Sequence, residues 1–355
     1  MNQNDFHKLI SGEKTGFGAS ILRLLLGLAA AGYSIVVQIR NFLYSNGWLK
    51  AHRAEAAVLS IGNITTGGTG KTPLVIWLCK RIISNSRFHI SKCAILTRGY
   101  KTGAKETENF TDEPAIFAES CPEVKVIVNP DRVAGAEEAA IKFGTKVLIM
   151  DDGFQHLRLA KDLDIVAIDA TLPFGYGRIL PAGLLREPVS SLKRAGAVVI
   201  TRCDQITKNE LSELEEKLRL INPDMVISQS MHTPAYVKSI DNKEINIEEL
   251  KGKKIFAFCG IGNPGSFLNT ITTTGAGLVG SKIFNDHHHY TEACIADIYE
   301  QAERLKADLI LTTQKDQNKI TRRASSKTEI PLAYIGIEIK FLSGEEKLWG
   351  LIKNV

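Results

Sequence analysis

The chain has 355 residues, with 44 lysines and arginines against 39 aspartates and glutamates, so its formal net charge is +5. Hydrophobic residues make up 44% of the chain and charged residues 23%, which is typical of a soluble globular protein. This composition excludes a disordered chain, a fibrous repeat and a membrane protein with several spans. The small positive excess gives no reason to expect nucleic acid as a partner.

The first predicted element is an apolar helix with basic flanks. Leu24–Ile39 contains no charged residue and lies between Arg23 and Arg40. As a helix it would be about 24 Å long, short of the roughly 30 Å hydrocarbon core of a bilayer. Two interpretations stay open, a buried core helix or a helix that lies on or dips into a membrane with its basic flanks facing anionic head groups.

Short apolar strands then alternate with helices. This order predicts a mostly parallel sheet covered on both faces, the doubly wound α/β class. We expect strands at 58–62, 93–97, 124–128, 146–150, 164–168 and 197–201, and helices at 73–84, 133–143 and 205–222.

A second, smaller α/β unit is expected after Asn222-Pro223, which ends a charged helix. We therefore place an N-terminal helix region at 1–50, a phosphate-binding domain at 51–225 and a smaller domain at 226–355. In the smaller domain we expect strands at 254–259, 278–284, 308–312 and 332–338, and helices at 266–272 and 292–305.

A glycine-rich loop joins the first strand of the larger domain to its first helix, from Gly62 to Pro73. Glycines let backbone N–H groups turn toward phosphates, Lys71 would reach the β- and γ-phosphates, and Thr72 would bind Mg²⁺. The strict Walker pattern has glycine where this chain has Thr65. The strand–loop–helix context nevertheless predicts a phosphate-binding loop, and the alternative is a glycine-rich turn that binds nothing.

Two carboxylates, Asp151 and Asp152, directly follow the apolar strand at 146–150. Parallel α/β sheets bind ligands at the C-terminal ends of their strands. One carboxylate could hold Mg²⁺ while the other lies nearer the transferred phosphate, which predicts a nucleotide-dependent enzyme. A plain turn or helix cap remains the alternative.

Several further motifs occur in a fixed order along roughly residues 15–345. They are Thr97-Arg-Gly-Tyr100, Asp112-Glu-Pro114, Asn129-Pro-Asp-Arg132, Asp151-Asp-Gly-Phe-Gln-His156, Leu180-Pro-Ala-Gly-Leu-Leu-Arg-Glu-Pro188 and Asp286-His-His288. In these motifs and in the phosphate loop, the chain resembles the tetraacyldisaccharide 4′-kinases of lipid A biosynthesis. The family's phosphate loop is similar in lacking the first Walker glycine.

The resemblance implies an enzyme that transfers the γ-phosphate of ATP, with Mg²⁺, to the 4′-hydroxyl of a tetraacylated glucosamine disaccharide 1-phosphate, giving lipid IVA. It implies a RecA-like larger domain, an active site between the two domains, and a location at the cytoplasmic face of the bacterial inner membrane. The apolar helix then reads as membrane-associated rather than as core. We expect no nucleic-acid partner and a monomeric chain.

The resemblance also assigns residues to roles. ATP would lie on residues 65–72 (Thr65, Thr66, Gly67, Gly68, Thr69, Gly70, Lys71 and Thr72), with Thr72, Asp151, Asp152 and Glu187 at the metal and Tyr100, Arg132 and Arg186 on the substrate side. Lys71 and Asp152 would act in catalysis, together with an Asp112–His287 pair that activates the hydroxyl. His288 stays open as the alternative histidine. Without the resemblance, Asp112 reads as a helix cap and His287 as a surface residue.

Two signals favour other functions. Gly260, Gly262 and Gly265 form a GxGxxG pattern after a strand, which is typical of a dinucleotide-binding oxidoreductase but weak alone. Thr201-Arg-Cys-Asp204 is similar to the base-reading loop of GTPases, so a P-loop GTPase or ATPase switch without lipid kinase activity is the alternative function.

Overall fold

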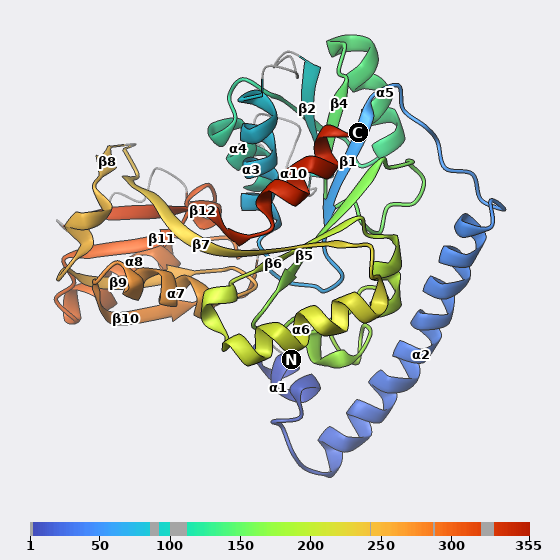
Figure 1. The fold of residues 1–355 in the computed structure, drawn as a ribbon. Helices are drawn as coiled ribbons and strands as arrows, with labels where there is room; N and C mark the ends of the chain where they lie inside the picture. Colours follow the sequence, from blue (N-terminus) through green and yellow to red (C-terminus); the bar gives the residue numbers. More distant parts are fainter. Residues whose placement is uncertain (1–2, 86–91, 100–111, 242, 287, 321–329) are drawn as a thin grey trace. The chain divides into compact units, whose positions relative to one another are not determined.

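The structure is a computed structural model. It describes residues 3–85, 92–99, 112–241, 243–286, 288–320 and 330–355. The chain forms two compact units (Figure 1). Unit 1 contains Met1–Lys105, Phe117–Met231 and Lys340–Val355, and unit 2 contains Glu106–Ile116 and His232–Ile339. The C-terminal segment Lys340–Val355 thus belongs to the same unit as the glycine-rich loop. The predicted division at 225/226 places this segment in the smaller domain instead.

Unit 1 is built on parallel strands in the order β7-β6-β5-β1-β4-β2-β3. The central strands are buried along their whole length, because helices cover both faces of the sheet, and this explains their near-continuous apolar sequences. The doubly wound α/β prediction is confirmed. The strands are β1 (Ala57–Gly62), β2 (Cys93–Thr97), β3 (Lys125–Val128), β4 (Val147–Asp151), β5 (Leu163–Asp169), β6 (Ala197–Thr201) and β7 (Val226–Ser239).

The helices of unit 1 begin where side chains satisfy their first N–H groups. Asp131 accepts hydrogen bonds from the N–H groups of Val133 and Ala134 at the start of α5, and Thr207 forms a capping box with Glu210 at the start of α6. The α-helices are α1 (Gln3–Ser11), α2 (Phe17–Ser45), α3 (Lys71–Ile83), α4 (Asp112–Ser120, which begins in unit 2), α5 (Arg132–Phe143), α6 (Lys208–Ile221) and α10 (Glu345–Lys353); the short 3-10 helices are η2 (Gly175–Gly177), η3 (Val189–Arg194) and η4 (Cys203–Gln205).

Unit 2 is a smaller α/β unit, as expected. Its strand order is β10-β9-β11-β12-β7, in which β10, β9, β11 and β12 pair in parallel and β8 pairs antiparallel with β7. Its elements are β8 (Glu244–Ile245), η5 (Ile247–Leu250), β9 (Lys254–Cys259), α7 (Pro264–Thr273), β10 (Gly277–Ile283), α8 (Glu292–Arg304), β11 (Leu309–Thr313), α9 (Gln314–Gln317) and β12 (Leu332–Ser343).

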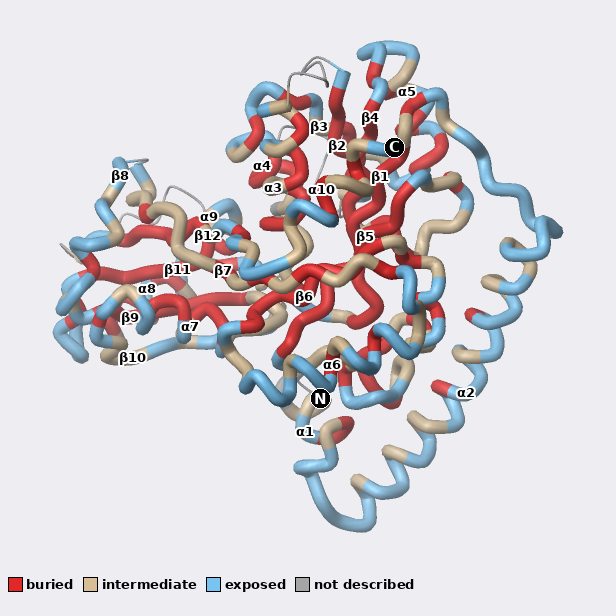
Figure 2. Tube along the Cα trace, viewed as in Figure 1, coloured by how far each residue is buried: buried red, intermediate tan, exposed pale blue. Residues whose placement is uncertain are grey.

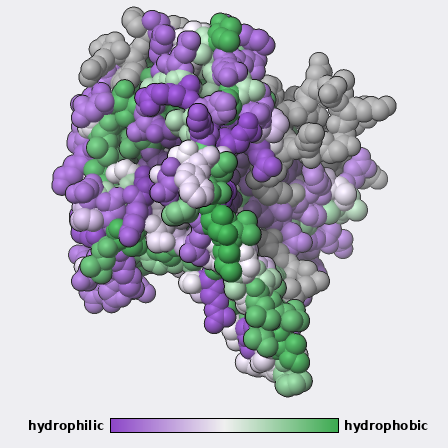
Figure 3. All heavy atoms as spheres, turned by 90° about the vertical axis from the view of Figure 1, so that its right-hand side faces the viewer, coloured by the Kyte–Doolittle hydropathy of each residue, from purple (hydrophilic) through white to green (hydrophobic). Residues whose placement is uncertain are grey.

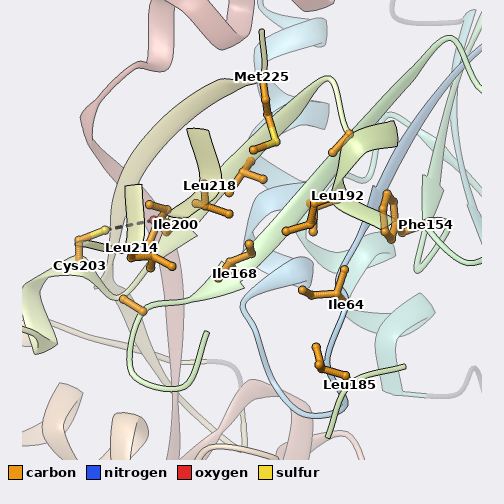
Figure 4. Close-up of a cluster of buried hydrophobic side chains, with 14 residues drawn as sticks. Ile64, Phe154, Ile168, Leu185, Leu192, Ile200, Cys203, Leu214, Leu218 and Met225 are labelled. Carbon is orange, nitrogen blue, oxygen red and sulfur yellow. Dashed lines mark hydrogen bonds between the residues drawn. The ribbon is translucent and has the colours of Figure 1, made fainter. Parts of the chain in front are cut away.

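The core of unit 1 lies on both faces of its sheet, with the central strands buried between the covering helices (Figure 2). One hydrophobic cluster joins strands β5 and β6 to α6 and η3. The same cluster contains Ile64, Phe154 and Leu185, with Leu185 next to Ile64 (Figure 4). These three residues come from the glycine-rich loop, the segment after Asp152 and the segment before Arg186, so core packing fixes the three chain segments that form the candidate site.

Helix α2 is longer than the predicted apolar run and differs from an ordinary core helix. It has 29 residues and is about 44 Å long. Its most apolar 18-residue window has a mean hydropathy of 1.9, and only 11% of that window is buried. By length and composition it could cross a membrane. Its apolar side chains form a band along the surface (Figure 3), and Phe17, Leu24, Leu28, Ile35, Val36 and Ile39 are all more than half exposed. A buried core helix is therefore excluded.

Candidate functional site

The glycine-rich loop runs from the buried strand β1 into α3, as predicted. Gly67 and Gly70 have φ angles of 108° and 87°, a backbone conformation that residues with a Cβ rarely adopt. Inside the loop, the Asn63 amide donates a hydrogen bond to the Thr69 hydroxyl at 3.1 Å. The loop thus places Lys71 and Thr72 in the first turn of α3, where free N–H groups and the helix dipole favour an anion.

The end of β6 holds this loop from one side. The Thr201 hydroxyl donates to the Thr69 carbonyl oxygen at 2.9 Å, and the Arg202 guanidinium donates to the Gly68 carbonyl oxygen at 2.8 Å. Arg202 is 5% exposed, has a φ of 57°, and also forms a buried ion pair with Asp169. These contacts fix loop carbonyl groups to the sheet, so that they cannot turn freely into the space of a ligand.

The segment before Arg186 holds the loop from another side. The Thr66 N–H donates to the Leu184 carbonyl oxygen at 2.8 Å, and the Arg186 N–H donates to the Ile64 carbonyl oxygen at 2.7 Å. Two motifs that are more than a hundred residues apart in sequence are therefore paired through their backbones.

The two predicted carboxylates lie at the C-terminal end of β4 but have different environments. Asp151 is 2% exposed, and its carboxylate accepts a hydrogen bond from the Thr97 hydroxyl at 3.2 Å. Asp152 has a φ of 51° and is paired with Lys71 at 3.2 Å and with both of its oxygens to Arg186 at 3.0 and 2.9 Å. Burial alone would raise the pKa of Asp152, but Lys71 and Arg186 outweigh it and lower this pKa to about 2. Asp152 is therefore ionised at neutral pH.

Glu187 lies in an environment different from the expected metal side. Its side chain is fully buried, and its oxygens accept hydrogen bonds from Arg40 at 2.7 Å, Arg194 at 2.8 Å and Asn41 at 3.3 Å. Both carboxylate oxygens are thus occupied by protein donors. The side chain also has no exposed surface at which a metal ion could bind.

A basic cavity of about 500 Å³ opens beside the loop in unit 1. Among the residues that the structure describes, four arginines and one carboxylate line it, so it favours an anionic ligand. Burial and the neighbouring cations Arg132, Lys161 and Arg158 lower the pKa of His156 to about 4, so this lining histidine is neutral at pH 7. The charged lining residues are Arg40, Arg98, Arg132, Arg186 and Asp152.

Arg132 is 4% exposed and is oriented by the backbone around it. It donates to the Asn129 carbonyl oxygen at 2.8 Å and to the Asp151 carbonyl oxygen at 3.3 Å. The structure therefore brings the predicted residues Lys71, Asp152, Arg132 and Arg186 together around one cavity and the adjoining loop.

Some predicted residues cannot be placed. Tyr100 and His287 lie outside the described residues, and Asp112 begins α4 but its side chain is outside the described part as well. His288 is described: its ring stacks on Phe284 at 4.4 Å between centroids and its Nε2 lies 3.6 Å from the Cys294 sulfur.

The two signals for other functions have structural explanations. In the GxGxxG turn of unit 2, the Gly260 N–H donates to the buried Asp316 carboxylate at 3.0 Å, and a Cβ on Gly260 would lie 2.9 Å from the Asn285 carbonyl oxygen. The glycine therefore allows close packing of the protein backbone rather than of a dinucleotide. In the Thr201–Asp204 motif, Arg202 contacts the phosphate loop, whereas Asp204 is exposed.

Sequence reasoning missed three groups that the structure places at the site. Arg40 and Tyr33 come from α2. Arg98 belongs to the Thr97–Tyr100 motif, in which only Tyr100 was assigned a role. Arg40 was visible only as the charge that ends an apolar run. Among the described residues, no three His, Cys, Asp or Glu side chains gather as a metal site.

Comparison with known proteins points to one family. Residues 22–355 match the family model described as Tetraacyldisaccharide-1-P 4′-kinase. A protein named Tetraacyldisaccharide 4′-kinase from Halothermothrix orenii is 35% identical over 90% of this chain and 89% of the relative, and one from Elusimicrobium minutum is 36% identical over 83% and 81%. A crystal structure described as the "apo" form of LpxK from Aquifex aeolicus in complex with ATP is 27% identical, has a TM-score of 0.69, and aligns with 94% of this chain and 99% of that one.

Proposed function

The chain belongs to the tetraacyldisaccharide-1-P 4′-kinase family, and from that premise we propose that it transfers the γ-phosphate of ATP to the 4′-hydroxyl of a tetraacylated glucosamine disaccharide 1-phosphate, giving lipid IVA. One observation carries this proposal beyond the family match. Lys71 in the phosphate loop and Arg186 beside the basic cavity share one carboxylate, Asp152, so the nucleotide and acceptor sites meet at a single ionised group.

ATP would lie on the loop of residues 65–72. The backbone N–H groups of the loop and the start of α3 would bind phosphate oxygens, and Lys71 would exchange its contact with Asp152 for the β- and γ-phosphates. The LpxK structure from Aquifex aeolicus, which is described as a complex with ATP, supports this choice of nucleotide.

Mg²⁺ fits the donor set at the end of β4. The Thr72 hydroxyl and the carboxylates of Asp151 and Asp152 are hard oxygen donors, and the low pKa of Asp152 keeps that carboxylate ionised. When bound, Mg²⁺ would neutralise charge on the phosphate oxygens. Because the Glu187 side chain is fully buried among Arg40, Arg194 and Asn41, whereas 30% of the Asp152 side chain is exposed, we assign the metal to the other three residues.

The acceptor would lie in the basic cavity. Arg132 and Arg186 are fixed by hydrogen bonds and can face an anionic group of the acceptor, such as its 1-phosphate, without first losing side-chain freedom. Tyr100 remains part of this proposed substrate side.

Transfer requires a group that accepts the proton of the sugar hydroxyl. We assign this role to His287, oriented by Asp112. The choice of His287 over His288 is supported by the packing of the His288 ring against Phe284 and its contact with Cys294. Lys71, Mg²⁺ and the loop N–H groups would stabilise the charge on the transferred phosphoryl group, which is the larger part of such catalysis.

The enzyme would work at the cytoplasmic face of the inner membrane as a monomer. The exposed apolar side chains of α2 would enter the lipid, and Arg23 would lie at the level of the head groups. An interfacial position fits α2 better than a full span, since Tyr33, Arg40 and Asn41 contact Arg186 and Glu187 of unit 1.

The test is direct. Purified protein is incubated with Mg-ATP and the tetraacyldisaccharide 1-phosphate in mixed micelles, and the lipid is analysed by mass spectrometry for one added phosphate. We expect product with the wild type and none with Lys71→Ala. No product despite competent ATP binding, or turnover of GTP far above ATP without lipid phosphorylation, would overturn the proposal in favour of a nucleotide switch.

A further inference from the structure

Glu187 forms a buried charge cluster that the phosphoryl-transfer mechanism does not use. We name Glu187, Arg40, Asn41 and Arg194 the Glu187 junction. The Glu187 side chain is fully buried, whereas about a third of the side-chain surface of Arg40 and of Arg194 is exposed to solvent. A buried carboxylate is stable only when it is paired and hydrogen-bonded. The contact geometry of Glu187 is therefore specified by the two segments that supply its donors, α2 and η3.

The junction is continuous with the phosphate site. Arg186, the residue before Glu187, binds both oxygens of Asp152. On the other side, the Arg194 guanidinium lies 4.4 Å from the centre of the Phe154 ring and donates to the Phe154 carbonyl oxygen at 3.3 Å. Both routes end in the short segment Asp152–Phe154, so two chains of contacts link Glu187 to the segment that carries Asp152.

The junction is also continuous with the membrane-facing helix. Tyr33 donates to the Arg186 carbonyl oxygen at 3.1 Å, and Arg40 and Asn41 bind Glu187 directly. With the buried Ala30 and Val37, these residues recur at intervals of three and four, which places them on one face of α2. Much of the rest of the helix is exposed and apolar. Helix α2 therefore has one face for unit 1 and another that is free to meet lipid.

We propose that Glu187 is a positioning residue that couples the seating of α2 on unit 1 to the placement of Arg186 and Asp152, so that docking of α2 on a lipid surface sets the affinity and reactivity of the phosphate site. The inference rests on the proposed membrane docking and kinase activity. Lipid that immobilises the apolar face of α2 holds Tyr33, Arg40 and Asn41 in the arrangement that orders the Arg186–Glu187 segment, and the binding of nucleotide at Asp152 favours the same arrangement.

The decisive measurement is nucleotide affinity with and without lipid. Binding of a fluorescent ATP analogue is titrated in buffer and with saturating phosphatidylglycerol–phosphatidylcholine vesicles that contain no acceptor. For the wild type we expect the vesicles to tighten binding by about fivefold or more, within the usual range of coupling between two sites. Glu187→Gln, which keeps the shape of the side chain and removes its charge, should reduce that effect to less than about twofold.

Matched variants separate coupling from vesicle affinity and from folding. Arg40→Gln and Arg23→Gln each remove one positive charge from α2, but Arg23 contacts Lys14 and Ser20 rather than Glu187. At saturating vesicles, Arg23→Gln should keep the lipid effect and Arg40→Gln should lose it. Tyr33→Phe, which removes one hydroxyl, should weaken the effect and serves as the test if Glu187→Gln fails to fold.

The outcomes distinguish this inference from the proposed function. Suppose that the wild type phosphorylates the lipid but vesicles do not change its nucleotide affinity, or that vesicles affect Arg40→Gln and Glu187→Gln as they affect Arg23→Gln. In either case the proposed coupling is wrong and the kinase assignment stands. If the wild type makes no lipid product, the proposed function fails whatever the vesicles do.

Discussion

The Arg202 guanidinium donates a hydrogen bond to the Gly68 carbonyl oxygen at 2.8 Å, so the end of strand β6 holds the middle of the phosphate loop. The same arginine is paired with the buried Asp169. One side chain therefore links loop conformation to the core of unit 1. The motif that contains it is explained by support of the loop rather than by recognition of a base.

Arg202→Ala should impair both stability and nucleotide use. The free energy of unfolding should fall by about 3 kcal/mol, because Asp169 would be left buried without its cation. The KM for ATP should rise by about tenfold, because the Gly68 carbonyl group would no longer be fixed. Urea unfolding and steady-state kinetics measure the two effects.

The control for this variant is Asp204→Asn, two residues away and exposed. It should leave ATP kinetics and the preference for ATP over GTP unchanged. A gain or loss of GTP use in Asp204→Asn would instead support a base-reading role for this motif.

Asp152→Ala should reduce turnover much more than ATP binding. We expect kcat to fall by about 100-fold or more, since an ionised group beside the transferred phosphate is lost. Binding should change little, because the substitution also frees Lys71 from its ion pair with Asp152. Isothermal titration with ATP and single-turnover kinetics separate the two quantities, and equal losses in both would assign Asp152 to nucleotide binding.

His156 should make stability fall on mild acidification. Its pKa is lowered from 6.5 to about 4, by burial first and then by nearby cations, so between these values the unfolded chain binds a proton that the folded chain does not. Stability is therefore complete above pH 6.5 and is lost as the pH falls toward 4. Between pH 7.5 and pH 5 the loss from this group should be about 1–2 kcal/mol, allowing for its partial exposure.

Urea unfolding at the two pH values tests this effect against His156→Gln. The variant cannot take up the proton, so its stability should depend less on pH by that amount. The same pH dependence in both proteins would show that groups other than His156 cause it.

The exposed apolar face of α2 should determine vesicle binding. Leu28 and Val36 are 65% and 64% exposed, and replacing both with asparagine should lower partition into phosphatidylglycerol vesicles by about tenfold or more, because both side chains lose the favourable transfer into lipid. Vesicle sedimentation measures the change. Leu220→Asn removes a leucine that is 80% exposed on α6 and should leave binding unaltered; equal effects would indicate non-specific adsorption.

Much of the local organisation could be predicted from the sequence. Strands β1 to β6 lie within a residue or two of their predicted bounds, because buried parallel strands are short apolar runs that end at turn residues. The predicted glycine-rich loop joins β1 to α3, because its glycines and the start of a helix are local features. The strand β7 and the helix α10 were not predicted, since both depend on partners far away in the chain.

By itself, the sequence determined the α/β class, the phosphate loop and an ordered set of motifs whose family the comparisons confirm. These properties follow from local periodicity, glycine conformation and residue type. Only the tertiary structure decided the distant contacts of Arg40 and Arg202, because the pairs Arg40–Glu187, Arg202–Asp169 and Arg202–Gly68 are separated by 147, 33 and 134 residues. A buried ion pair forms between whichever charges packing brings together and excludes from water, and no local pattern specifies that choice. The basic end of an apolar run thus forms a contact between helix α2 and the buried Glu187 carboxylate.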